Sequence, residues 1–141
     1  MRMQRFLEAQ EDSYDTALRE ISDGCKMSHW MWYIFPQLKG LGRSYMADYY
    51  GLDGWKEAEA YWSEGTLRAR LIEITTELLN HTDETATEIF GSIDAMKLRS
   101  CMTLFEKVTG EELFGKVLDA FFDGRRDEMT LRMLEDEASG R

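Results

Sequence analysis

The chain has 141 residues, of which 43% are hydrophobic and 12% aromatic. A chain of this length and composition forms one domain with a genuine core, which excludes intrinsic disorder. The formal net charge of −10, from 27 acidic and 17 basic residues, argues against nucleic-acid polymers and anionic membranes as partners.

Cysteine content and hydropathy indicate the cellular compartment of the protein. Cys25 and Cys101 are too few for a disulfide scaffold, so we expect both thiols to be reduced. The first residues lack the apolar segment of a signal peptide, and the longest apolar run, residues 30–35, is far too short to span a membrane. We therefore expect a cytoplasmic protein with no membrane segment.

The N-terminal third of the chain predicts two helices. Apolar residues recur at spacings of three and four from Arg2 to Asp23, and Gly24 follows as a residue that can end a helix. The run 30–35, which Pro36 stops, fits a buried strand as well as a helical turn. We favour the helix, because the rest of the chain offers no second strand to pair with it.

Helix-capping residues and apolar residues at helical spacing predict the remaining helices. Ser44 caps a short helix that Gly51 closes, and a further helix spans residues 54–63. Leucine and isoleucine at 4-3-4 spacing predict a helix over residues 66–80. A capping box at residues 85–88 opens a short helix that Gly91 ends. The next helix is indicated by an apolar stripe, Leu98, Cys101, Phe105 and Val108, and Gly110 terminates it. Two more helices are expected over residues 111–123 and 127 to about 137. The sequence thus predicts an all-α single domain over residues 1–141, with about eight helices and a frayed tail at 139–141.

Two blocks combine large apolar residues with singly placed polar ones. Residues 26–44 hold the only proline, one of two histidines and two of four tryptophans, and residues 90–105 have the same mixture. We expect a pocket where these blocks meet. Neither a dinucleotide fingerprint nor a phosphate-binding loop occurs, and the only residue of metal-ligand type near His29 is Cys25. We therefore expect no metal and no cofactor.

Each candidate residue also has a structural interpretation. Lys26, Arg43 or Lys97 could hold an anion, but Lys97 also lies one helical turn from Asp94 and could pair with it. His29 is flanked by tryptophan, and an ionisable ring in such an apolar setting needs a hydrogen-bonding partner or a functional role. It could donate or shuttle a proton. The candidate catalytic residue is His29, and the candidate ligand-binding residues are Lys26, Ser28, Trp30, Trp32, Gln37, Arg43, Ser44, Asp94, Lys97 and Ser100.

Two further patterns favour the core over chemistry. Cys101 lies on an apolar helical stripe, where a thiol is inert, so we do not expect it to act as a nucleophile with His29. Trp30, Trp32 and Phe35 could stack on a base, but aromatic residues this close together more often belong to the core.

Several strings resemble the family called domain of unknown function 1810, a set of small, mostly bacterial proteins. The resemblance spans about residues 6 to 130 and rests on Ser28-His-Trp-Met-Trp32, Phe35-Pro-Gln37, Gly40-x-Gly42-x-Ser44 and Phe90-Gly91-x-x-Asp94-x-x-Lys97-x-x-Ser100. It implies an all-helical single domain with no assigned reaction. A fainter similarity in helical layout, to bacterial N-glycosidases acting on riboflavin intermediates or ADP-ribosylated bases, implies a nucleotide-like ligand.

These observations predict two functions. The first is a polar and aromatic pocket for a small anionic or nucleotide-like metabolite, which, in an enzyme, would serve N-glycoside hydrolysis. The second is a non-enzymatic interaction module whose motif residues only hold the fold together. In that case the C-terminal helix, with Met129 and Met133, is the expected site of a protein partner or of self-association.

Overall fold

The computed structural model describes residues 3–140, and within that range every regular element is helical. The elements are α1 (Gln4–Ser22), α2 (Met31–Ile34), α3 (Tyr45–Tyr50), α4 (Gly54–Ser63), α5 (Gly65–Leu78), the 3₁₀ turn η1 (Leu79–His81), α6 (Ala86–Phe90), α7 (Ser92–Thr109), α8 (Glu112–Phe122) and α9 (Glu128–Ala138). The nine α-helices of the described residues agree with the expected all-α fold of about eight helices.

Local signals in the sequence fix several helix ends. The Thr85 side chain accepts from the backbone of Glu88 while the Glu88 carboxylate accepts from that of Thr85, which confirms the capping box. Ser44 caps α3 through the amide of Ala47, as predicted. At the other end of the chain Ser139 and Gly140 form a turn, and Arg141 lies outside the described residues, as does the predicted helix start at Arg2.

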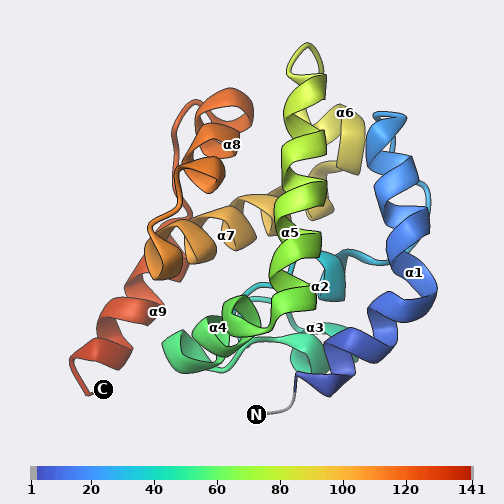
Figure 1. The fold of residues 1–141 in the computed structure, drawn as a ribbon. Helices are drawn as coiled ribbons and strands as arrows, with labels where there is room; N and C mark the ends of the chain where they lie inside the picture. The colour runs from blue at the N-terminus through green and yellow to red at the C-terminus, as the bar shows by residue number, and fades with distance from the viewer. Residues whose placement is uncertain (1–2, 141) are drawn as a thin grey trace.

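Helix α5 runs through the middle of the molecule (Figure 1). It packs against α1 on one side and against α4 and α8 on the other, while α7 packs against α6, α8 and α9. The predicted stripe Leu67, Leu71, Ile74 and Leu78 is buried on α5. Leu98, Cys101 and Phe105 of α7 are equally buried, so the two stripes contribute to one hydrophobic core.

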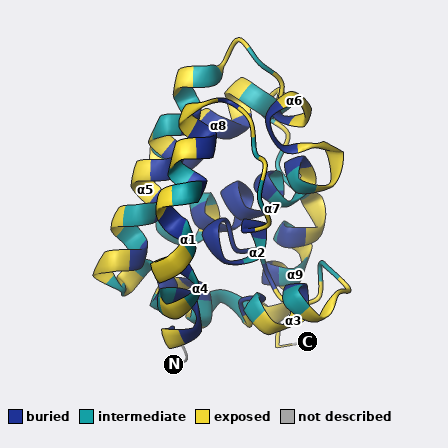
Figure 2. Cartoon of the chain, turned by 90° about the vertical axis from the view of Figure 1, so that its right-hand side faces the viewer, coloured by how far each residue is buried: buried dark blue, intermediate teal, exposed yellow. Residues whose placement is uncertain are grey.

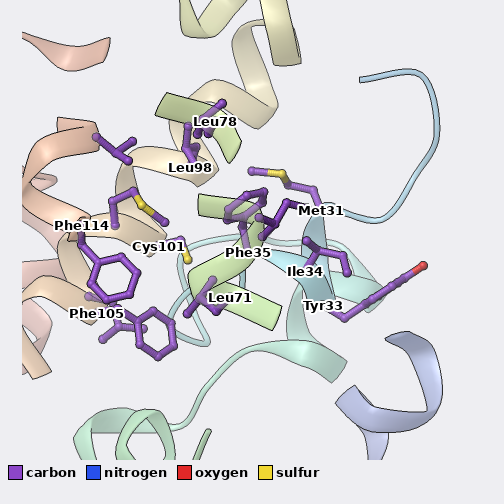
Figure 3. Packing of buried hydrophobic residues seen from close by; sticks show 14 of the residues in the cluster. Met31, Tyr33, Ile34, Phe35, Leu71, Leu78, Leu98, Cys101, Phe105 and Phe114 are labelled. Atoms are coloured by element: carbon purple, nitrogen blue, oxygen red, sulfur yellow. The ribbon is translucent and has the colours of Figure 1, made fainter. Parts of the chain in front are cut away.

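The apolar run 30–35 forms the single turn α2, as favoured over a strand. Met31, Tyr33 and Ile34 are buried, and α2 is dark blue at the centre of Figure 2. Figure 3 shows Met31, Ile34 and Phe35 beside leucines of α5 and α7. This segment is thus a buried helical turn within the hydrophobic core and not part of a sheet.

A short backbone link positions the loop after Pro36. Leu38 and Leu52 form an isolated parallel bridge, in which Lys39 N donates to Leu52 O and Leu52 N donates to Gln37 O, each at 2.9 Å. Loop 37–44 is therefore held beside the segment that precedes α4. No helix among the described residues is long and apolar enough to cross a membrane.

Candidate functional site

The segment before α2 is held by one carboxylate that the sequence analysis did not single out. Glu20, near the end of α1, accepts hydrogen bonds from the backbone amides of Met27 and Ser28 at 2.8 and 2.9 Å. It also accepts from the Ser28 hydroxyl at 2.6 Å and from the Trp30 indole at 2.8 Å. Glu20 follows the buried Ala17 by three positions, so helical periodicity already placed this acid at the edge of the core-facing side.

These bonds change the acidity of Glu20. Burial alone would raise the pKa of its carboxyl, but the hydrogen bonds from Ser28, Met27 and Trp30 outweigh burial and lower that pKa to about 2. The charged carboxylate therefore organises residues 27–30. Two predicted ligand-binding residues, Ser28 and Trp30, are occupied by this structural role, and Trp30 is only 1% exposed.

The predicted charged residues of the two blocks do meet. Lys26 Nζ lies 2.9 Å from Asp94 Oδ2, and Lys97 Nζ lies 3.5 Å from Asp94 Oδ1. Lys26 is also placed over the ring of Trp30, and Lys97 over the ring of Trp32, at 4.9 and 5.4 Å from the ring centres. Asp94 is thus bound more closely to Lys26, whose side chain is only 7% exposed, than to Lys97.

His29 is exposed and makes no hydrogen bond or ion pair with any other described residue. The expectation that this ring sits in an apolar setting is wrong, because Trp30 points into the core while its sequence neighbour points away from it. The cost of burying an unpaired imidazole therefore does not arise at this position.

A cavity of about 500 Å³ opens beside Lys97. One wall comes from α7, a second from loop 37–44 with Ala47 of α3, and a third from the start of α9. The backbone N–H of Asp127 donates to the Thr103 hydroxyl at 2.9 Å, which holds this third wall against α7. The lining residues are Gln37, Leu41, Gly42, Arg43, Ser44, Ala47, Ile93, Met96, Lys97, Ser100, Asp127 and Met129.

Five predicted ligand-binding residues line this cavity, and they differ in how free they are to bind. The Ser100 hydroxyl donates to the carbonyl of Met96 at 3.2 Å, and the Ser44 hydroxyl serves as the cap of α3. Arg43 is exposed and pairs with no other described residue. Gln37 and Lys97 complete the set. The cavity is therefore lined by two cationic residues, Arg43 and Lys97.

The other candidates lie elsewhere. Trp32 lines a much smaller hollow of about 10 Å³, which Gln37 and Lys97 also border and which has room for about one water molecule. Asp94 borders a separate surface hollow beside Phe90. Lys26, Ser28, Trp30 and His29 line none of these hollows, so the first half of the block 26–44 supports the site without lining it.

The start of α9 separates the main cavity from a second one of about 490 Å³. Asp127 and Met129 line both cavities, and Arg99, Arg125 and Arg126 line the second. The Arg126 guanidinium is engaged by Glu106, and Arg99 lies 3.7 Å from Asp127 Oδ1. In the second cavity, Arg99 and Arg126 are therefore paired with carboxylates, whereas Arg125 forms no ion pair with another described residue.

The Cys101 thiol lies in the hydrophobic core, whereas Cys25 is exposed. Burial raises the pKa of the Cys101 thiol well above its ordinary value, in agreement with a core role. Across residues 3–140, no group of three or more His, Cys, Asp or Glu side chains could hold a metal ion.

The comparisons with known proteins agree with the fold. The family model described as "Protein of unknown function (DUF1810)" matches residues 1–134. The chain belongs to this family. Within solved structures, the DUF1810 chain is similar to the conserved hypothetical protein Rv1873 from Mycobacterium tuberculosis, at 38% identity and a TM-score of 0.92. The match covers 94% of this chain and 96% of that one. No curated protein matches the chain.

Proposed function

We propose that the 500 Å³ cavity binds a small anionic metabolite, with Lys97 and Arg43 as the groups that recognise its charge. The observation that carries the proposal is that the Asp94 carboxylate pairs with two lysines, Lys26 and Lys97. Because this carboxylate lies closer to Lys26 than to Lys97, the Lys97 ammonium is only partly neutralised. Its position in the cavity lining makes it available to a phosphate or carboxylate.

The size and composition of the cavity support this proposal. Ligand sites typically occupy a few hundred to about a thousand cubic ångströms and combine apolar walls with a few polar groups. In a chain with a net charge of −10, this lining carries two cations, Lys97 and Arg43, against one carboxylate, Asp127. Binding alone is proposed, since His29, the candidate proton donor, is not part of this lining.

Thermal unfolding in the presence of anions tests the proposal. Inorganic phosphate and a panel of phosphorylated metabolites, including nucleotides, are added at increasing concentration, and a ligand present at 100 times its Kd stabilises the fold by about 2.7 kcal/mol. The Lys97→Met variant should lose the shift. Lys107→Met is the matched control, because Lys107 is an exposed lysine of the same helix that lines none of the cavities described above. Equal shifts in both variants, or none in the wild type, would refute the site.

An interaction module is the second candidate, and exposed apolar side chains favour it. Ile93, Met96 and Met129 are 71%, 63% and 48% exposed. Met133, by contrast, is half-buried and packs against the core. Sedimentation velocity over a range of concentrations tests self-association through this surface: a dimer in the wild type that the Met96→Ser substitution dissolves would favour the module.

A further inference from the structure

The exposed apolar side chains are unevenly distributed. Seven large hydrophobic residues are exposed among the described residues, and three of them line the main cavity together with Lys97. Ile93, Met96, Lys97 and Ser100 follow the spacing i, i+3, i+4 and i+7 on α7, which is the spacing of a buried helical stripe. The chain therefore carries a second stripe, directed into the cavity instead of the core.

The lining also lacks what a nucleobase needs. No aromatic side chain is among the described residues that line the main cavity. Trp32 and Tyr50 border only the neighbouring hollow of about 10 Å³, which is far too small for a base. Methionine side chains, in contrast, adapt their shape to flexible aliphatic groups.

The charges suit a ligand with one anionic end. Lys97 and Arg43 lie on two of the walls, whereas the third wall presents the Asp127 carboxylate. One oxygen of that carboxylate accepts from the backbone and hydroxyl of Thr130, and the other lies 3.7 Å from Arg99. A second anionic group near Asp127 would meet a negative charge that is already in place.

We infer that the ligand is a free, small amphiphilic anion, in which one phosphate or carboxylate binds Lys97 and Arg43 while an aliphatic body lies on Ile93, Met96 and Met129. This inference rests on the proposed anion site and narrows its ligand class away from nucleotides. The aliphatic body covers the exposed apolar surface that the protein alone leaves in contact with water.

Calorimetric titration with inorganic phosphate, a series of alkyl phosphates from methyl to hexyl below their micellar concentrations, and AMP tests the inference. Each added methylene should tighten binding roughly fourfold, from the free energy of burying one methylene. Met96→Ser should weaken hexyl phosphate by roughly tenfold and leave inorganic phosphate unchanged. Ile72→Ser, an exposed apolar residue of α5 that is 37% exposed and outside the cavity, is the matched control and should change neither.

The outcomes separate the inference from the proposed function. Binding of phosphate and AMP that depends on Lys97 but not on alkyl length would overturn the amphiphile and leave the anion site standing. Binding that ignores Lys97→Met, or no binding at all, would overturn both. Sedimentation with vesicles of phosphatidylcholine and phosphatidic acid separates free ligand from membrane. We expect the protein to stay in the supernatant, and co-sedimentation that Met96→Ser abolishes would overturn the free-ligand assignment.

Discussion

The indole of Trp30 donates a 2.8 Å hydrogen bond to the carboxylate of Glu20, which joins the end of α1 to the turn before α2. The same carboxylate holds two backbone amides of that turn. This places Lys26, just before the turn, within reach of Asp94 on α7. The ion pairs beside the cavity therefore depend on a hydrogen-bonded centre that does not itself touch the cavity.

The Glu20 centre makes stability sensitive to acid. Its folded-state pKa of about 2 lies below the ordinary value of 4.5 for a glutamate, so the charged form stabilises the fold at every pH above that ordinary value. This contribution, on the order of 3 kcal/mol, declines as the pH falls from about 4.5 to about 2. Denaturant midpoints measured across that range should fall more steeply for the wild type than for Glu20→Gln.

Gln at position 20 keeps the shape but removes the charge, so this variant should also be less stable at neutral pH, by about 2 to 3 kcal/mol. Glu8 is an exposed acid of the same helix and provides the control substitution Glu8→Gln. Parallel midpoint curves for wild type and Glu20→Gln between pH 4.5 and pH 2 would contradict the assignment of Glu20 as the organising carboxylate.

The two lysines around Asp94 should respond differently to removal of their charge. Lys26 is almost fully buried and pairs with Asp94 at 2.9 Å, so Lys26→Met leaves a half-buried carboxylate with one distant partner, at a cost of about 2 to 3 kcal/mol. Lys97→Met removes a longer, more exposed contact and should cost less than about 1 kcal/mol. Chemical denaturation of each variant measures the contrast.

The double variant Asp94→Asn/Lys26→Met supplies the control, because it removes both charges of the closer pair. It should be more stable than Lys26→Met alone, since no unpaired charge remains. A large loss from Lys97→Met, equal to that from Lys26→Met, would mean that Lys97 is a structural residue, and the proposed anion site would lose its main cation.

His29→Gln should change the free energy of unfolding by less than about 0.5 kcal/mol, because the ring is exposed and makes no contact that folding requires. It should also leave anion binding unchanged, since His29 does not line the cavity. Thermal shift with phosphate on this variant checks both statements. Loss of the shift would place His29 in the ligand's reach after all.

Local patterns predicted the helices well for a physical reason. The capping box at Thr85 and the stripe from Leu67 to Leu78 depend on residues three or four positions apart, and these interactions form within the helix itself. The family resemblance predicted the same fold, and the match over residues 1–134 confirms that family. Even the ambiguous run 30–35 was resolved correctly by the absence of a partner strand.

The site was only partly predictable, because its walls come together through tertiary packing. Residues 37–44 and Lys97 were named from the sequence, but Asp127 and Met129 reach the cavity only because α9 starts against Thr103 of α7. Glu20 was overlooked because its partners lie in an irregular turn, which no periodicity describes. The orientation of His29 likewise depends on Trp30, its neighbour, being held by a residue ten positions earlier.

Gly24 lies where α1 ends against the turn that precedes α6. Its φ is +74°, and a Cβ at this position would collide with the Glu84 carboxylate and lie 3.1 Å from His81 Nδ1. Gly110, after α7, has the same φ but open space where its Cβ would lie. Gly110→Ala should therefore destabilise the fold only through the strain of alanine at positive φ, by about 1 kcal/mol. Gly24→Ala, which adds a collision, should destabilise the fold by roughly twice as much.

Combining Gly24→Ala with Glu84→Ala separates the collision with the carboxylate from the backbone strain at positive φ. With the carboxylate gone, the added cost of Gly24→Ala should approach that of Gly110→Ala, as measured by denaturant midpoints of the four variants. If Gly24→Ala and Gly110→Ala cost the same in the native background, the Glu84 side chain moves aside freely, and the close packing of α1 against the His81–Glu84 turn contributes little to stability.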